Sequence, residues 1–196
     1  MLDVGANEGQ FANNARNRLP NAKIVSFEPI PEAYNVLCQR FKDDNNFQAF
    51  NIGFGHRKEK RSFLQNSFSP VSSILEFLPS QKEFYPRTKD STTIEISLHR
   101  LDEFIQNLEV ESNVLLKIDV QGFEDKVLQG ASSILDRIKV IYIECSFMKF
   151  YKGQPLFDDI YEFLLEKGFS FRGVADQLNA GVIDEPTQID AVFIKD

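Results

Sequence analysis

The sequence predicts an α/β fold in which a mostly parallel, seven-stranded sheet is covered by helices on both faces. Short apolar runs, typical of buried strands, alternate along the chain with amphipathic stretches of helical period. Strand and helix in alternation imply parallel strands with covered faces. The last run places Ile189, Ala191 and Phe193 on one face and Asp190, Val192 and Ile194 on the other, and an antiparallel strand is expected there. The seven runs are 2–4, 23–28, 47–52, 113–119, 139–145, 169–175 and 188–194.

Length and composition limit the chain to one domain, residues 1–196. Of its 196 residues 42% are hydrophobic, enough for one substantial core and too few for two ordinary domains. A formal net charge of -7 argues against binding to a nucleic-acid backbone. No run approaches the roughly 18 apolar residues of a membrane span, and no leader pattern is recognised. Cys38 and Cys145 are not in a paired spacing. We therefore expect a cytoplasmic protein with reduced thiols that binds neither nucleic acid nor membrane.

The first element is a strand that ends in a glycine turn. Residues 2–4 have the pattern of a strand's buried end, and Gly5, Asn7 and Gly9 form a tight turn into a helix that begins near Gln10. Such a turn presents backbone N–H groups to a carboxylate or phosphate. Only four residues precede the turn, against the usual five or six of a strand, so the sequence leaves open whether an upstream segment belongs to the protein.

Three further helices are placed by apolar spacing and by their breaks. Residues 31–41 begin on Pro31, which suits the first helical turn, and keep their apolar residues on one face. Residues 123–135 and 156–167 repeat this pattern, and the second of them ends at Gly168.

Residues 56–112 interrupt the alternation between the third and fourth core strands. They contain a predicted strand at 60–65, a Ser-rich loop "NSFSPVSSIL", a strand at 92–98 and a helix near 101–108. A connection of this length is usually functional. The alternative is a surface insertion without a role.

Polar residues follow five of the strand-like runs. In an open parallel sheet the carboxyl ends of the strands share one edge, where ligands bind. Taken singly, an acid such as Asp3 or Asp119 has a simple explanation as a helix cap. Jointly, the five predict one polar crevice. They are Asp3, Glu28, Asn51, Asp119 and Glu144.

The spacing of the first two elements predicts a ligand with a ribose. Glu28 follows Gly9 by 19 residues, close to the separation at which the acid after a second strand binds ribose hydroxyls. The turn lacks the third glycine of a dinucleotide site, and Glu8 puts a negative charge where a pyrophosphate would approach. These features favour S-adenosylmethionine over NAD.

Five segments together resemble the FkbM-type methyltransferases. They are "LDVGANEGQF", "VSFEPIPEAY", "FNIGFG", "LLKIDVQGFEDKVLQGA" and "VIYIECSF", and the resemblance extends from residue 2 to about residue 196. It implies a Rossmann-like class I methyltransferase fold and S-adenosyl-L-methionine as cofactor. For many members it also implies O-methylation of a hydroxyl on a small molecule or sugar, which would be the partner of this chain. The sequence does not identify that acceptor or the oligomeric state.

The resemblance also assigns cofactor-binding residues. The methionine end of S-adenosylmethionine is assigned to the first turn, with Asp3, Gly5, Ala6, Asn7 and Gly9. The ribose is assigned to Glu28, which is flanked by Pro29 and Ile30. The adenine is assigned to Asn51, Ile52 and Gly53. Asp119 is expected beside the donated methyl group. The family more often has Glu where this chain has Gln121, so the resemblance assigns that position no role.

The candidate catalytic residues are Asp119, Glu144 and Lys117. An alcohol is a poor nucleophile at neutral pH, so a positioned base, Asp119 or Glu144, is expected. Lys117 lies in a run that should be buried, on the same face as Asp119. Either it forms a buried ion pair with Glu144 or another acid of the site, or its ammonium reaches solvent along a buried stem.

Other readings remain open at this point. We predict no metal, because two Cys and two His are scattered; Asp119 with Glu144 is the one pair suited to magnesium. His99 is a weaker candidate for the base, and His56 for a ligand contact. The alternatives to a methyltransferase are a cofactor-binding module without catalysis and an NAD-dependent oxidoreductase.

Overall fold

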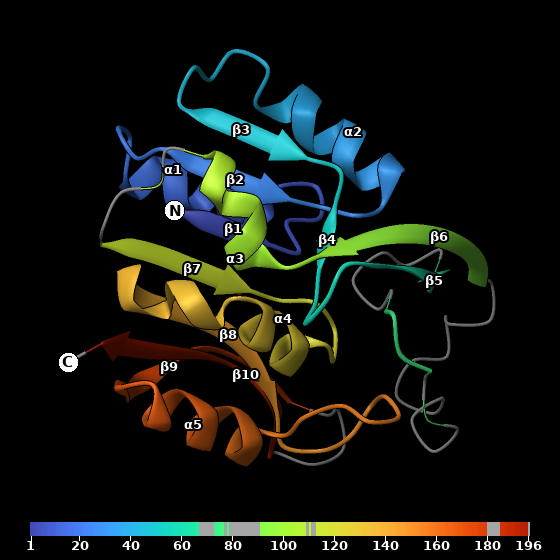
Figure 1. Cartoon of the computed structure of the whole chain (residues 1–196), viewed down its shortest axis with the longest axis vertical. Helices are drawn as coiled ribbons and strands as arrows, with labels where there is room; N and C mark the ends of the chain where they lie inside the picture. The colour runs from blue at the N-terminus through green and yellow to red at the C-terminus, as the bar shows by residue number, and fades with distance from the viewer. Residues whose placement is uncertain are drawn as a thin grey trace.

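The predicted seven-stranded sheet is present, in the order β3-β2-β1-β7-β8-β10-β9 (Figure 1). The computed structural model describes residues 1–66, 73–76, 78, 91–108, 110, 113–179 and 185–195. Within this sheet β3, β2, β1, β7 and β8 run parallel to one another, whereas β10 runs antiparallel to β8 and β9, as predicted for the last run. The strands are β1 (Leu2–Val4), β2 (Ile24–Phe27), β3 (Phe47–Phe50), β7 (Val114–Ile118), β8 (Ile138–Ser146), β9 (Phe169–Asn179) and β10 (Pro186–Lys195).

The central strands are apolar because both of their faces are covered. Every residue of β1 and β2 is buried, and β9, at the sheet edge, is exposed along most of its length. Strand β9 is longer than the predicted run 169–175 because antiparallel pairing with β10 continues as far as Asn179. The predicted run 47–52 is shorter in the structure, because β3 ends at Phe50; the short strand β4 (Gly53–Phe54), which follows it, lies outside the main sheet.

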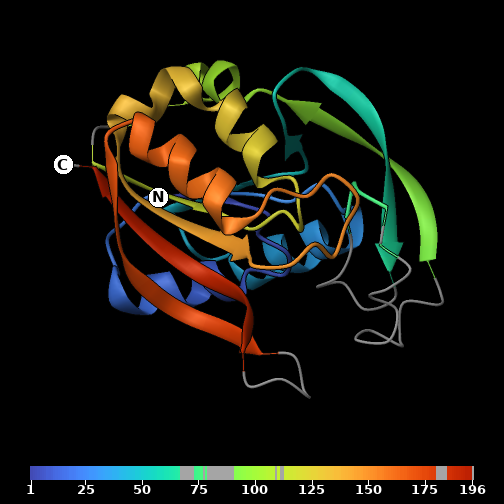
Figure 2. The same ribbon diagram turned by 90° about the horizontal axis from the view of Figure 1, so that it is seen from below.

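Helices cover both faces of the sheet, as Figure 2 shows. Helices α1 (Gln10–Arg18) and α2 (Pro31–Arg40) lie on one face, where Leu37 and Phe41 pack with Ala12. On the other face lie α3 (Leu101–Phe104), α4 (Glu124–Gly130) and α5 (Phe157–Glu166). None of the helices within the described residues is long and apolar enough to span a membrane.

The helix predicted at 123–135 is shorter than expected. Helix α4 ends at Gly130, and a 3-10 helix (Ser132–Arg137) continues the chain. A Cβ atom on Gly130 would lie only 2.0 Å from the carbonyl oxygen of Gly55, so glycine is required for this close approach. The helix predicted near 101–108 likewise consists of α3 and a 3-10 turn (Ile105–Asn107).

Two strands of the insertion join β4 in a second sheet beside the carboxyl edge of the first (Figures 1 and 2). Its order is β4-β6-β5, with β5 (Glu59–Asn66) and β6 (Ser91–His99) antiparallel. Phe63, Ile96 and Leu98 pack against Ile30 and Phe123, which follow strands of the main sheet. The insertion therefore joins the molecule through an apolar contact. Most of the predicted Ser-rich loop lies outside the described residues.

Candidate active site

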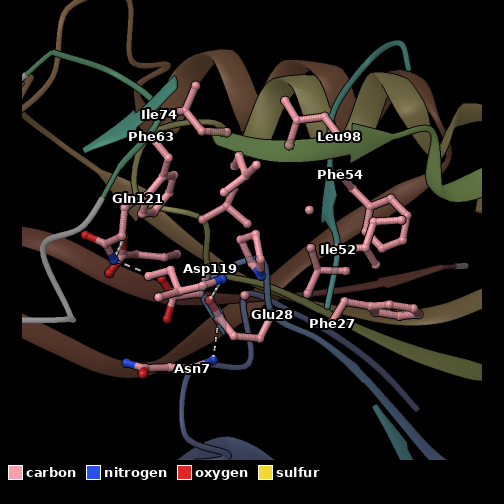
Figure 3. A pocket seen from close by; sticks show the side chains of 18 of the residues that line it. Asn7, Phe27, Glu28, Ile52, Phe54, Phe63, Ile74, Leu98, Asp119 and Gln121 are labelled. Atoms are coloured by element: carbon pink, nitrogen blue, oxygen red, sulfur yellow. Dashed lines mark hydrogen bonds between the residues drawn. The ribbon is translucent and has the colours of Figure 1, made fainter. Parts of the chain in front are cut away.

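A cavity of about 420 Å³ opens where the carboxyl ends of β1, β2, β7 and β8 meet the second sheet (Figure 3). Its floor is polar and its far wall is apolar. The polar lining comes from Asn7, Glu28, Asp119, Gln121, Glu144 and Gln188. The apolar wall comes from Phe54, Phe63, Ile74, Ile96 and Leu98, with Leu178 from β9.

Strand register explains why the acids gather on one face of the sheet. Asp3 pairs with Ser26 on one side and with Lys117 on the other, so these three side chains form one row across the strands. Side chains two residues further along a strand face the same way. Glu28 and Asp119 therefore form a second row, nearer to the carboxyl edge and to the cavity.

The glycine turn after β1 is shaped by packing. Gly5 and Asn7 adopt positive φ angles of 76° and 49°. A Cβ atom on Gly5 would lie 1.8 Å from the carbonyl oxygen of Asp119, so no other residue fits there. The amides of Gly5 and Ala6 both donate to the carbonyl oxygen of Phe27, at 3.0 Å each. These N–H groups are thus used within the protein rather than left for a ligand.

Of the residues assigned to the methionine end, only Gly5 and Asn7 line the cavity. Asp3 and Ala6 are buried beneath it. A Cβ atom on Gly9 would lie 2.7 Å from a side-chain carbon of Leu37, so this glycine allows α2 to approach the turn.

Glu28 is a buried carboxylate at the cavity floor, with 4% of its surface exposed. Its Oε2 accepts the amide N–H of Asn7 and its Oε1 that of Ile30, both at 2.8 Å. Burial raises the pKa of Glu28 to about 7, although both hydrogen bonds oppose the rise. Each carboxylate oxygen has a second lone pair, so the group can still accept two neighbouring hydroxyls.

The residues assigned to the adenine are divided. Ile52 and Gly53 line the cavity, as does Pro29. Asn51 is not among the lining residues; its Nδ2 donates to the carbonyl oxygens of Glu28 and Pro29, at 2.9 and 3.1 Å. Asn51 thus fixes the turn that carries Glu28.

Lys117 is buried, with 5% of its surface exposed. Its Nζ donates to the carbonyl oxygen of Gly5 at 2.7 Å and forms ion pairs with Asp3 at 3.4 Å and Asp119 at 3.5 Å. Burial alone would lower the pKa of Lys117, but Asp119 and Asp3 raise it above its ordinary value. The predicted ion pair exists, with Asp3 and Asp119 as partners rather than Glu144. The alternative, an ammonium in solvent, does not occur.

Asp119 and Glu144 are brought together by the side chain of Gln121. The Nε2 atom of Gln121 lies 2.9 Å from Asp119 Oδ1 (Figure 3) and 3.1 Å from Glu144 Oε2. Burial raises the pKa of Glu144 well above its ordinary value, and Asp119 adds to the rise. A carboxylate with such a pKa holds a proton more strongly, which suits a base that must accept one from an alcohol.

Neither histidine lines the cavity. The ring of His99 lies 6.2 Å from that of Phe104, and burial lowers its pKa. Tyr151 lies close to the site, and its hydroxyl donates to Gln121 Oε1 at 3.3 Å. Among the described residues, no group of three or more His, Cys, Asp or Glu side chains is arranged to hold a metal ion.

Sequence reasoning missed the apolar wall and the residues from β9 and β10. The alternation of "TTIEISL" marks Ile96 and Leu98 as one face of a strand, but not what that face covers. Leu178 and Gln188 lie far along the chain from the other lining residues. They reach the cavity because β10 lies next to β8 in the sheet.

Comparison with known proteins places this arrangement in a family. The family profile described as "Methyltransferase FkbM domain" matches residues 3–171. The chain is 25% identical over 160 residues to the 2-O-methyltransferase NoeI of Sinorhizobium fredii, covering 79% of this chain and 66% of the relative. It is 25% identical over 146 residues to the hexuronic acid methyltransferase AglP of Haloferax volcanii, covering 74% of this chain and 54% of the relative. The chain thus spans less than two thirds of the length of either relative.

Solved structures share the fold. Fibrillarin of Aeropyrum pernix, in complex with S-adenosyl-L-methionine, matches with a TM-score of 0.54 and 13% identity, over 97% of this chain and 64% of that one. Magnesium protoporphyrin IX methyltransferase of Synechocystis PCC 6803, with the same cofactor bound, matches with a TM-score of 0.52 and 10% identity. The match covers 100% of this chain and 69% of that one. The expected class I methyltransferase fold is therefore confirmed.

Proposed function

This chain belongs to the FkbM family of S-adenosylmethionine-dependent methyltransferases, and we propose that it methylates a hydroxyl of a small molecule or sugar. One observation carries the proposal. A buried carboxylate suited to a ribose, Glu28, and a pair of carboxylates suited to an alcohol, Asp119 and Glu144, line the same cavity. The names of the relatives NoeI and AglP support a sugar as acceptor.

The cavity fits the parts of S-adenosylmethionine. The second lone pairs of Glu28 suit the two ribose hydroxyls. Ile52, Pro29 and the wall with Leu98 offer apolar surface to a flat base. Asp119 adds a partly exposed carboxylate, which is a favourable neighbour for the positive sulfonium.

When bound, the cofactor supplies a methyl group on a positively charged sulfur. The protein must hold the acceptor oxygen about 3 Å from that carbon and in line with the bond that breaks. Glu144 would take the hydroxyl proton as the new C–O bond forms, and Lys117 would hold Asp119 in place beside the donor. The proton would then pass from Glu144 to solvent water once the product has left.

The test compares Asp119→Asn with Glu144→Gln. Methyl transfer from tritiated S-adenosylmethionine would be measured against a panel of monosaccharides, glycosides and hydroxylated small molecules. We expect Asp119→Asn to weaken both S-adenosylhomocysteine binding and turnover, because its charge lies next to the donor. Glu144→Gln should lower turnover by about a hundredfold to ten-thousandfold and leave donor affinity unchanged.

The pH profile separates a base from a group that only orients the donor. Since the pKa of Glu144 is raised, wild-type turnover should increase with pH until Glu144 is ionised, and Glu144→Gln should flatten this acid limb. Full turnover by Glu144→Gln with an unchanged profile would contradict its role as the base. Donor binding without turnover on any acceptor would instead support a cofactor-binding module.

A further inference from the structure

Gln121 has a backbone that is held in an unusual conformation. Its φ of 54° lies in the left-handed region, which few residues other than glycine adopt. The amides on both sides of it, of Val120 and Gly122, donate to Glu124 Oε1 at 3.1 Å each. Ser73 Oγ donates to the carbonyl oxygen of Gln121 at 2.6 Å. The loop is therefore fixed from two directions, and the strained backbone aims the side chain into the cavity.

The side chain of Gln121 uses all of its polar atoms inside the site. Nε2 donates to one oxygen of Asp119 and one oxygen of Glu144, and Oε1 accepts the hydroxyl of Tyr151. Tyr151 is itself buried, with 3% of its surface exposed. These three contacts fix which end of the amide faces the carboxylates.

Two carboxylates that share a partly buried site repel each other. Proteins offset this repulsion with a shared proton, a bound cation or hydrogen-bond donors. A primary amide has two N–H groups on one atom, so a single neutral nitrogen can donate to both acids. Nε2 of Gln121 lies between Asp119 and Glu144, where a cation would otherwise bridge them.

We propose that Gln121 is a positioning residue that holds Asp119 and Glu144 as an amide-bridged pair and takes the place of a bridging divalent cation. This inference rests on the proposed function, because it concerns the same two acids. Replacing the amide by a carboxylate, in Gln121→Glu, removes the donor between Asp119 and Glu144 and leaves three converging acids, a ligand set suited to Mg²⁺ or Mn²⁺. Lys117 remains paired with the other oxygen of Asp119.

The first test measures metal binding and needs no acceptor. Electron paramagnetic resonance of Mn²⁺ would be recorded with wild type, Gln121→Glu and Gln188→Glu at millimolar Mn²⁺. Gln188 lines the same cavity, but its Nε2 donates to Ser146 rather than to the acid pair. Gln188→Glu is therefore a matched control for the added charge. We expect one bound Mn²⁺ per chain in Gln121→Glu, and none in the other two.

Two results would overturn the inference. Mn²⁺ bound by wild type and lost in Asp119→Asn would mean that the amide does not occupy the place of a cation. Equal Mn²⁺ binding by Gln121→Glu and Gln188→Glu would mean that position 121 does not bridge the acids.

The second test concerns positioning. Gln121→Met keeps the length of the side chain and removes the N–H groups. We expect the turnover number to fall by up to about a hundredfold, the effect of a small misplacement of reacting groups. S-adenosylhomocysteine affinity should change less than twofold, and Mn²⁺ should restore part of the turnover in Gln121→Glu but none in Gln121→Met.

An unchanged turnover number in Gln121→Met would contradict the positioning role. If wild type shows no methyl transfer to any acceptor, the proposed function fails, and the Mn²⁺ measurement still decides whether Gln121 replaces a cation.

Discussion

At the scale of single residues, one buried ammonium stabilises two acids. Lys117 is buried between Asp3 and Asp119 and also donates to the carbonyl oxygen of Gly5. Asp3 is completely buried; its Oδ2 accepts the hydroxyl of Ser26 at 3.2 Å, and its Oδ1 has no hydrogen-bond partner. The ammonium of Lys117, at 3.4 Å from Oδ1, is the main charge that stabilises this carboxylate. The pair thus connects the first turn with the strand end that carries Asp119.

Removal of the ammonium should therefore destabilise the fold. We expect Lys117→Met to lower the free energy of unfolding by about 3 to 5 kcal/mol, the cost of leaving a buried charge without its partner. Urea unfolding followed by far-ultraviolet circular dichroism would measure it, since the chain has no Trp.

Two variants serve as controls for this measurement. The double variant Asp3→Asn, Lys117→Met should regain part of the loss, because the uncompensated acid is gone. Lys60→Met removes an exposed ion pair with Glu95 and should leave stability nearly unchanged. An equally small effect in Lys117→Met would contradict the buried pair.

Glu28 should determine donor affinity in a pH-dependent way. Glu28→Ala should weaken S-adenosylhomocysteine binding by about 1.5 to 3 kcal/mol, the range for hydrogen bonds to a charged group. Because the folded pKa of Glu28 is about 7, wild-type affinity should fall as the pH drops below that value and the carboxylate is protonated. Glu28→Ala should lose this dependence.

Calorimetry from pH 6 to pH 8 would check both expectations for Glu28. The exposed Glu32→Ala, at the start of α2, is the control and should bind like wild type. Unchanged affinity in a folded Glu28→Ala protein would remove the ribose assignment.

At the scale of elements, the N-terminus of α4 is anchored by an acid that the cavity does not use. Glu124 is 3% exposed, and its Oε1 accepts the amides of Val120 and Gly122. Burial raises the pKa of Glu124 to about 7, although these hydrogen bonds oppose the rise. In the unfolded chain a glutamate titrates at its ordinary value, near 4.5.

The sign of the resulting pH dependence follows from proton linkage. Between about pH 4.5 and pH 7 the folded state binds more protons at Glu124 than the unfolded state, so stability falls as the pH rises through this range. At about 1.4 kcal/mol per unit of pKa shift, the loss reaches about 3 kcal/mol.

Glu124→Gln keeps an oxygen that can accept both amides and removes the titration. We expect this variant to be more stable than wild type at pH 8 and to have a smaller fall in stability between pH 5 and pH 8. Part of the fall should remain, because Glu28 titrates in the same sense. Urea unfolding across this range would measure it, with the exposed Glu166→Gln as control. If the stability of Glu124→Gln fell with pH as steeply as that of wild type, Glu124 would not be a source of the pH dependence.

At the scale of the whole molecule, the sequence predicts most of the elements because their signals are local. Apolar runs and helical spacing place the strands and helices, and the polar ends of strands place Glu28, Asp119 and Glu144 at one edge. The partners of Lys117 depend instead on strand order. Asp3 lies next to Lys117 because β1 is placed between β2 and β7 in the sheet. No local sequence pattern contains this order of strands.

The cavity wall could not be predicted for the same reason. The second sheet packs on the carboxyl edge through Phe63, Ile96 and Leu98, and β10 brings Gln188 beside β8. The role of Gln121 depends on a left-handed backbone between a strand and a helix. Such a conformation in a residue other than glycine is set by its surroundings.

The central claim is that this cavity binds S-adenosylmethionine, and a titration of the wild-type chain tests it most directly. Isothermal titration calorimetry would be run with S-adenosylhomocysteine, with NADH and with buffer. We expect S-adenosylhomocysteine to bind at one site per chain and NADH to give no heat above buffer, because Glu28 and the turn before α1 suit a ribose without a pyrophosphate. Binding of NADH without binding of S-adenosylhomocysteine would contradict the claim.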